Sequence, residues 1–230
     1  MAASSSFDLV ALAGDSLNIN SSVPLNAQSV VVERYLGLIA ATTQLAVSSG
    51  NHDLTGPDGR GEQSALWLRE VDEGCLHSDG ESLVLEDTLI TICPWWDGPL
   101  GRAEVVSQLT AAAARRPDTW VWLYHWPPLG SPTCWTGRRD YGDPDLRQWI
   151  EEFEPDLVLT GHVHDAPFKA DGSWMDRIAR TWVFNAGHQI GNVPAHIELD
   201  LEKHQATWVS IMGTETLDLR EVVAPARTVF

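Results

Sequence analysis

The chain has little cysteine and no long apolar run. Its three cysteines, Cys75, Cys93 and Cys134, are odd in number, and none forms a Cys-x-x-Cys pair. This argues against a disulfide framework and a thiolate zinc site, so we expect buried thiols in a reducing cytoplasm. No stretch approaches the roughly 20 apolar residues of a membrane span. The first six residues carry no Lys or Arg, so no secretory signal is expected.

Positive charge is also scarce. Lys and Arg total 15 against 32 Asp and Glu, which gives a formal net charge of −17. Nucleic-acid affinity comes largely from Lys and Arg that neutralise phosphates, so we expect no long DNA or RNA partner and no membrane. The length of 230 residues and the hydrophobic fraction of 43% are ordinary for one α/β domain. We therefore expect a single domain over 1–230, with 214–230 as a C-terminal tail.

Four short apolar runs each lead into residue types that bind metals. The runs are 8–13, 44–49, 119–124 and 156–160, and they are followed by Gly14-Asp15, Gly50-Asn51-His52-Asp53, His125 and Gly161-His162-Val163-His164. Such runs are typical of parallel strands covered on both faces, and open α/β sheets bind ligands at the carboxyl ends of their strands. We therefore expect the four groups to meet in one site. If strand geometry persists, the imidazoles of His162 and His164 point the same way.

The segments between these runs predict the remaining elements. Residues 26–42 carry Val30, Val31, Tyr35, Leu38 and Ile39 at near-helical spacing, which indicates the crossover helix of a βαβ unit. Further helices are predicted over 62–71, 102–116 and 144–153, and a hairpin over 82–86 and 88–93. Residues 180–185, 195–199 and 206–211 predict strands of a second sheet. Residues 130–142 form a long polar segment of the kind that often covers a substrate.

The candidate ligands mix nitrogen and oxygen donors. Asp15 offers a carboxylate, Asn51 a carbonyl oxygen, and His125 and His162 imidazole nitrogens. This mixture suits Mn, Fe, Zn, Co or Ni better than Ca or Mg, which prefer oxygen alone. We expect one or two such ions per chain.

In this order, the four motifs resemble the calcineurin-like metallophosphoesterases, and the resemblance covers roughly Phe7 to Gly187. It implies an α/β fold in which a metallophosphoesterase-like β-sandwich is flanked by helices in αββα layers. It also implies that Asp15 bridges two ions, that Asn51, His125 and His162 complete the second site, and that His164 belongs to the first.

The sequence departs from the family at the first metal site. Family members usually supply that site with an Asp-x-His on an earlier strand, and this sequence has none. Asp8 cannot replace it, because seven extended residues place it about 23 Å from Asp15. We therefore expect an N-terminally truncated form of the fold, with Asp97 or His188 as further candidate donors. Asn18 stands where the family often has a second aspartate, and is expected to hydrogen-bond near the site.

The chemistry implied by the resemblance is phosphoester hydrolysis. A metal-activated hydroxide would attack the phosphorus, while His52 assists the leaving oxygen and Asp53 orients the His52 ring. The first hypothesis is a phosphodiesterase acting on a small phosphodiester such as a nucleotide. The alternatives are a phosphomonoesterase and a non-catalytic scaffold of the same fold. An uncovered sheet edge where the first strand is missing also suggests a homodimer.

Aromatic and basic residues near these motifs are candidates for substrate contacts. Trp95, Trp96, Trp126 and Trp135 lie in loops expected to border the site, and Trp126 or Trp135 could stack on a base or aryl group. Arg138 could clamp a phosphate. The competing interpretation is structural, because most of the 11 tryptophans must lie in the core and a loop arginine is usually solvated.

Overall fold

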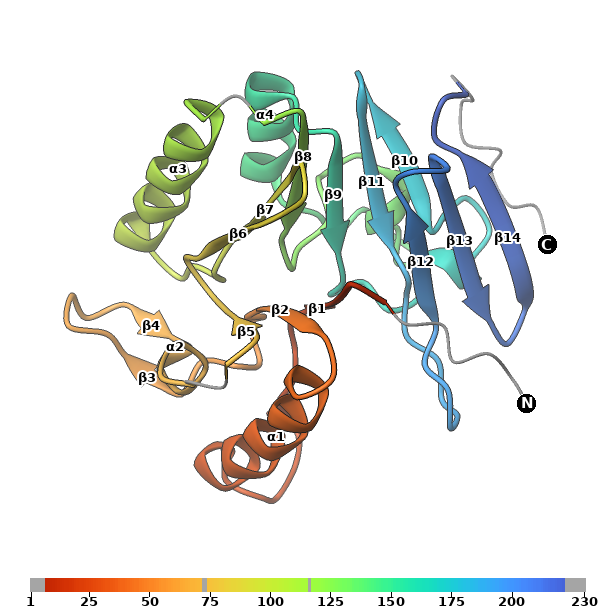
Figure 1. Cartoon of the computed structure of the whole chain (residues 1–230). Coiled ribbons are helices and arrows are strands. Elements are labelled where there is room, and N and C mark those ends of the chain that lie inside the picture. The colour runs from red at the N-terminus through yellow and green to blue at the C-terminus, as the bar shows by residue number, and fades with distance from the viewer. Residues whose placement is uncertain (1–6, 72–73, 116, 222–230) are drawn as a thin grey trace. The chain divides into compact units, whose positions relative to one another are not determined.

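The computed structural model describes residues 7–71, 74–115 and 117–221. It divides into two compact units, Met1–His125 and Trp126–Phe230, and each is described by itself (Figure 1). Both units combine helices with β-sheets, which confirms the predicted α/β class. The expectation of a single domain stays a prediction. Within the described ranges, no helix has the length and apolar character needed to cross a membrane.

A βαβ unit opens the first unit, as predicted. Strand β1 (Leu9–Ala13) and strand β2 (Gln44–Ser48) are parallel, and α1 (Leu25–Ala40) connects them. The register pairs Ala13 with Ser48, so the two strands end side by side. A short strand, β5 (Leu76–His77), pairs in parallel with the other edge of β2. The loops that follow β1 and β2 therefore leave this sheet at the same edge.

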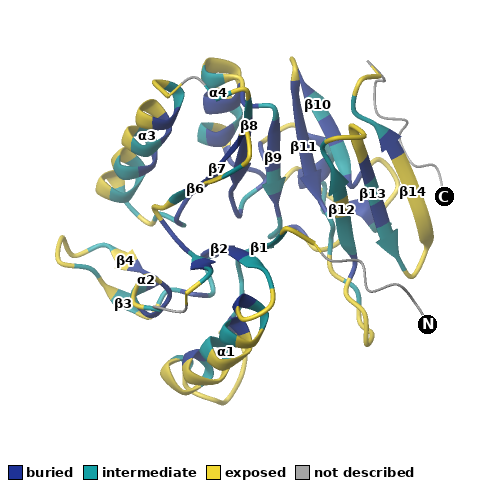
Figure 2. Cartoon of the chain, viewed as in Figure 1, coloured by how far each residue is buried: buried dark blue, intermediate teal, exposed yellow. Residues whose placement is uncertain are grey.

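Helix α1 packs mainly through residues other than those whose spacing predicted it. Its buried residues are Ser29, Leu36 and Ala40, with Val32 and Ile39 partly buried against the same core. Val30, Val31, Tyr35 and Leu38, whose spacing predicted the helix, are each at least half exposed. The outer side of α1 is accordingly drawn as exposed in Figure 2, whereas β2 is buried. Two apolar stripes run along this helix, and periodicity alone does not say which one meets the sheet.

The predicted helix over 62–71 is shorter than expected. Residues Gln63–Ser64 form β4, which pairs antiparallel with β3 (Gly56–Pro57). The helix that follows, α2, covers only Leu66–Arg69, with Trp67 and Leu68 buried. Backbone pairing with the preceding turn thus takes the first residues that the sequence pattern assigned to the helix.

The second sheet of the first unit contains the predicted hairpin. Strands β6 (Ser82–Leu85) and β7 (Thr88–Ile92) are antiparallel, and β8 (Thr119–Leu123) pairs in parallel with β7. Helix α3 (Pro99–Ala113) begins three residues earlier than predicted, with Pro at its start. Proline is favoured there because its fixed φ suits a helix and the N–H it lacks would have no helical partner. Strand β8 leads directly to His125.

The second unit begins with a long connection that contains a short 3₁₀ turn, η1 (Pro132–Cys134). Helix α4 (Pro144–Phe153) has the predicted bounds, and the Asp143 carboxylate caps it by accepting the Asp145 N–H. Strand β9 (Leu157–Thr160) follows, then a second 3₁₀ turn, η2 (Ala166–Phe168).

The last strands correct the predicted sheet arrangement. Strand β11 (Thr181–Asn185) pairs in parallel with β9 and antiparallel with β10 (Met175–Ile178), so it belongs to the sheet of β9. The separate sheet consists of β12 (His196–Asp200), β13 (Gln205–Ser210) and β14 (Gly213–Asp218). Strands β10 and β14 were not predicted. Residues 214–218 of the predicted tail therefore belong to strand β14, and residues 222–230 of the tail lie outside the described residues.

Candidate metal centre

Asp15 occupies a tight turn directly after β1. Gly14 and Asp15 both have positive φ angles, 83° and 57°. A Cβ on Gly14 would collide with the His125 ring and come within 2.8 Å of the Gly50 nitrogen. Glycine at this position therefore allows three loops of the first unit to approach one another closely.

His125 is held against this turn from the end of β8. Its Nδ1 lies 2.5 Å from the Ala13 carbonyl oxygen, which requires Nδ1–H as the donor. Its Nε2 lies 3.3 Å from Asp15 Oδ2, and the residue is only 2% exposed. The edge of the Trp95 ring packs on it, with centroids 5.7 Å apart. A histidine that donates one N–H to a backbone carbonyl and directs its other nitrogen to a carboxylate has the arrangement typical of a metal ligand.

Asn51 supplies a third donor in the same unit. Its Oδ1 is buried and has no hydrogen-bond partner among the described residues. Most buried polar side-chain atoms are hydrogen-bonded, so an orphaned oxygen calls for an explanation, and a bound cation is one. A Cβ on the preceding Gly50 would collide with Asp15 Oδ1 and lie 2.7 Å from His125 Nε2. The oxygen and nitrogen donors of the first unit thus fit a transition-metal ion.

His52 lies beside Asp15 rather than beside Asp53. The His52 N–H donates to Asp15 Oδ1 at 3.0 Å, and its Nδ1 is 3.8 Å from Asp15 Oδ2. The side chain is 24% exposed, so the ring is accessible to a ligand.

Asp53 has a structural role that the sequence analysis did not predict. Its Oδ1 accepts the Leu17 N–H at 2.9 Å and its Oδ2 accepts the Gly50 N–H at 2.8 Å. Both oxygens are therefore used to join the loops after β1 and β2. In the structure, Asp53 stabilises these loops and does not orient the His52 ring. Asn18, expected to hydrogen-bond near the site, instead accepts the Asn20 N–H on the surface.

The two aspartates of these loops have opposite pKa perturbations. Burial of the Asp15 carboxyl tends to raise its pKa, but the hydrogen bond and charge of His125, with the His52 N–H, outweigh this and hold the pKa at about 2. Burial raises the pKa of Asp53, and the N–H groups of Gly50 and Leu17 offset only part of this effect. Asp15 is therefore the group prepared to carry a negative charge toward a cation.

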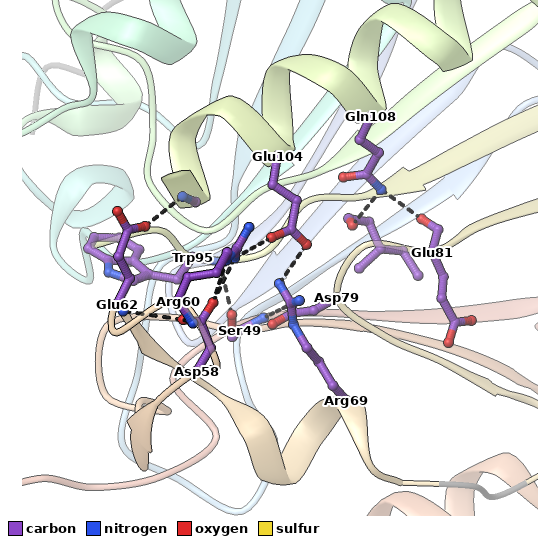
Figure 3. A network of polar contacts seen from close by, with 12 residues as sticks. Ser49, Asp58, Arg60, Glu62, Arg69, Asp79, Glu81, Trp95, Glu104 and Gln108 are labelled. Carbon is purple, nitrogen blue, oxygen red and sulfur yellow. Dashed lines mark hydrogen bonds and ion pairs between the residues drawn. The ribbon is translucent and has the colours of Figure 1, made fainter. Parts of the chain in front are cut away.

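A further buried acidic side chain, Asp79, supports the loop after β2. Its Oδ1 accepts the Ser49 N–H at 2.7 Å, and Ser49 Oγ accepts the Trp95 N–H at 2.9 Å (Figure 3). The backbone just before Gly50 is thus tied to the loop that carries Trp95. Sequence analysis missed Asp79, although its place in a turn directly after β5 was a usable signal.

The same figure shows a polar network between the β3–β4 region and α3. Glu104 pairs with both Arg60 and Arg69, and Glu62 accepts the N–H groups of Leu100 and Gly101 at the start of α3. Exposed ion pairs contribute little, about 0–1 kcal/mol each. The contacts of Glu62 stabilise the start of α3, because they satisfy N–H groups that have no partner within the helix.

In the second unit, His162 lies in an aromatic setting. Strand β9 ends at Thr160 and His162 has a φ of 58°, so the strand geometry on which a common direction of His162 and His164 would depend does not persist. The His162 ring packs on Trp126, with centroids 5.5 Å apart, and on Tyr141 at 5.1 Å. Trp126 therefore lies beside the predicted ligand His162, and its contact with a substrate stays a prediction. Tyr141 was missed as an individual residue.

His164 has a different neighbour, His188. Their ring centroids are 4.8 Å apart, and the His188 N–H donates to the His164 carbonyl at 3.0 Å.

The other predicted substrate contacts are Trp135 and Arg138. Trp135 lines a cavity of about 480 Å³ with Asp140 and Asp171, and its Nε1 donates to the Ala170 carbonyl. Arg138 is exposed, whereas the guanidinium of Arg139 lies 5.3 Å from the centre of the Tyr141 ring.

All three cysteines are free thiols. Cys93 and Cys134 are buried, as predicted, and Cys75 is only partly buried. Burial raises the pKa of the Cys93 thiol, so it remains neutral and behaves as a small apolar side chain.

Solved structures with a similar fold include that of TT1561 from Thermus thermophilus. It is 15% identical, has a TM-score of 0.56, and the match covers 93% of this chain and 87% of the other. A putative 5′-nucleotidase from Staphylococcus aureus is 12% identical with a TM-score of 0.45, over 85% of this chain and 41% of the other. A predicted phosphoesterase from Streptococcus pneumoniae is 14% identical with a TM-score of 0.37, and the match covers 95% of this chain and 93% of the other.

A comparison with curated proteins gives no match. The family model for calcineurin-like phosphoesterases, in contrast, matches residues 1–166. This range contains the five predicted ligands Asp15, Asn51, His125, His162 and His164. The fold and the matched range agree with the resemblance carried by the four motifs, and the chain belongs to the calcineurin-like phosphoesterase family.

Proposed function

We propose that this chain is a metal-dependent phosphodiesterase that acts on a small phosphodiester, with Asp15, Asn51, His125, His162 and His164 as metal ligands. Membership of the family supports metal-dependent phosphoester hydrolysis in general. The observation that carries the site is the buried, unpartnered Oδ1 of Asn51, which belongs to the same unit as the contact between Asp15 and His125. One or two divalent transition-metal ions, with manganese as the first choice, fit this donor set.

The residues of the first unit have separable roles in this proposal. A bound ion of this kind polarises a phosphoryl oxygen and lowers the pKa of a water molecule. Asp15 remains ionised, because its pKa is about 2. The Ala13 carbonyl accepts the Nδ1–H of His125, so Nε2 becomes the ligand atom when metal binding displaces its proton. His52, whose ring is accessible, donates a proton to the leaving oxygen. Its position depends on the backbone hydrogen bond to Asp15.

The second unit supports a small substrate with a flat group. Trp126 and Tyr141 pack on His162 and offer aromatic faces on which a base or aryl group can stack. Trp135 and Arg138 remain candidate contacts, and Arg139 joins them through its position over Tyr141. The net charge of −17 disfavours polymeric nucleic acid as a substrate. From the free thiols we also propose a cytoplasmic location, and from the edge position of β1 a homodimer.

The test compares hydrolysis by the Mn-loaded wild type, His52→Ala and His77→Ala, with diphenyl phosphate and phenyl phosphate as substrates, because the more basic phenolate leaving group needs a general acid. His77 is a matched control, because it lies in the same unit and contacts Gln44 and Glu81. We expect faster turnover of the diester. Loss of a general acid lowers kcat by about 100-fold or more, so His52→Ala should lose activity while keeping its metal. His77→Ala should match the wild type.

Two outcomes would replace this proposal. Faster hydrolysis of the monoester would show a phosphomonoesterase. Absence of metal-dependent hydrolysis of either substrate by the wild type, despite bound metal, would show a non-catalytic scaffold of the same fold.

A further inference from the structure

We propose that His188 is a metal ligand that acts together with His164 on one ion. In the structure, a further imidazole, that of His188, lies beside the predicted ligand His164. The inference deepens the proposed function and rests on it. It uses only residues of the second unit.

The first supporting observation is the geometry of the two rings. Their centroids are 4.8 Å apart and their planes are inclined by 37°. Two imidazole nitrogens that bind one ion at about 2.0–2.1 Å lie within roughly 4 Å of each other. Binding of one ion by both rings requires rotations about the side-chain torsions that bring one nitrogen of each ring to that distance. Both residues are exposed, so an ion can reach them.

The second observation is that the backbone fixes the two histidines relative to each other. The His188 N–H donates to the His164 carbonyl at 3.0 Å. Asn185, which is 1% exposed, donates from Nδ2 to the Val163 carbonyl at 2.9 Å and accepts the Gly187 N–H at 2.9 Å. The bonds to the Val163 and His164 carbonyls connect segments that are more than 20 residues apart in the sequence. Ligands positioned before the ion arrives bind it with a smaller loss of conformational entropy.

Gly187 makes this close approach possible. Its φ is 71°, and a Cβ there would lie 2.9 Å from the His164 carbonyl oxygen and 2.9 Å from Pro167 Cδ. A side chain at this position would separate the two backbone segments and therefore the two imidazoles.

Strand topology explains why both histidines leave the sheet at one edge. Strands β9 and β11 are parallel, and their last residues, Thr160 and Asn185, are paired. His164 follows the first strand end by four residues, and His188 follows the second by three. The carboxyl edge of parallel strands is the usual place for ligands in α/β sheets. Neither His196 nor His204 shares this position, since each lies at the start of β12 or in the turn after it.

The experiment measures metal binding by the whole chain, independently of activity. Wild type, His188→Ala and the control His196→Ala are loaded with Co²⁺ and then with Mn²⁺. The metal content, the Kd, the ligand-field absorption of Co²⁺ and the number of imidazole nitrogens coupled to Mn²⁺ in pulsed EPR are recorded. His196 is a suitable control because it is partly exposed in the same unit and contacts the Pro194 carbonyl.

We expect His188→Ala to weaken metal binding at least 10-fold and to remove one coupled imidazole nitrogen, and His196→Ala to behave as the wild type. Replacing both His164 and His188 should weaken binding less than the product of the single effects, because the two act on one ion. Equal melting temperatures of the metal-free proteins would exclude a folding defect, and if His188→Ala melts lower, His188→Gln takes its place in the comparison.

An unchanged Kd and an unchanged nitrogen count in His188→Ala would overturn the inference, and so would a wild type that binds no metal. Failure of the proposed function is distinguishable from this. If the wild type binds metal through His188 but hydrolyses neither phosphoester, the inference stands and the phosphodiesterase proposal falls.

Discussion

Replacement of Asp79 by Asn should remove a large part of the pH dependence of stability. The carboxyl of Asp79 is 7% exposed, its Oδ1 accepts the Ser49 N–H, and its Oδ2 has no partner among the described residues. Burial therefore raises its pKa from 3.8 to about 7, and the hydrogen bonds from Ser49 offset only part of this. The protonated acid is the form that the folded protein favours.

The sign and the size follow from proton linkage. Between pH 4 and pH 7 the folded state keeps this proton and the unfolded state has lost it, so stability falls as the pH rises. Each pKa difference of one corresponds to about 1.4 kcal/mol, so the full effect is about 4 kcal/mol, of which about 3 kcal/mol falls between pH 5 and pH 8. Asn has nearly the same shape, keeps the acceptor for the Ser49 N–H and does not ionise.

The assay is urea unfolding in EDTA at constant ionic strength, at several pH values from 5 to 8. The quantity of interest is the free energy of unfolding of Asp79→Asn minus that of the wild type. We expect this difference to be about 3 kcal/mol larger at pH 8 than at pH 5. The exposed Asp87→Asn should keep the wild-type slope. A parallel pH dependence of Asp79→Asn and wild type would refute the reasoning, because it would mean that Asp79 is ionised in the folded state.

Three further changes test the site and its support. Gly50→Ala should lower metal affinity at least 10-fold, because the added Cβ collides with Asp15 Oδ1. Gly56→Ala is the control, since a Cβ there meets no atom within 4 Å, and it should leave the affinity unchanged. Isothermal titration with Mn²⁺ measures both affinities. Glu62→Ala should lower the free energy of unfolding by about 1 kcal/mol, because α3 loses its N-terminal cap. Glu62→Gln keeps one acceptor, so it should lower that free energy by a smaller amount. Equal values for the two variants in urea unfolding would contradict the capping role. Trp126→Ala should raise KM for aryl diesters several-fold while Trp126→Phe largely preserves it, and equal effects on a methyl phosphodiester would show that stacking is not involved.

Sequence reasoning was most successful where chemistry and strand ends coincide. The runs before Asp15, Asn51, His125 and His162 are strands β1, β2, β8 and β9, and β1 and β2 are parallel as expected. The family follows from the same motifs, because few folds place these residue types after successive strands in this order. Helix α4 was also predicted with its bounds, since Asp143 and Pro144 are strong start signals.

Errors arose where the outcome depends on partners distant in the sequence. The apolar pattern of α1 contains two stripes, and only packing against the sheet selected Leu36 and Ala40 over Tyr35 and Leu38. Asp53 was assigned to His52 because the two are adjacent, yet its oxygens accept N–H groups of two loops. The predicted homodimer, the metal ligand set and the substrate remain predictions.

The sequence by itself determined the family and the candidate donors, because those depend on residue type and order. The tertiary structure decided which of these side-chain atoms come into contact. The Nδ1–H of His125 reaches the Ala13 carbonyl across 112 residues, and His188 meets His164 across 24. Such contacts require that strands pair in a given register and that Gly14 and Gly187 let backbones approach closely. These are properties of the folded chain, since no local pattern specifies which distant segments will be in contact.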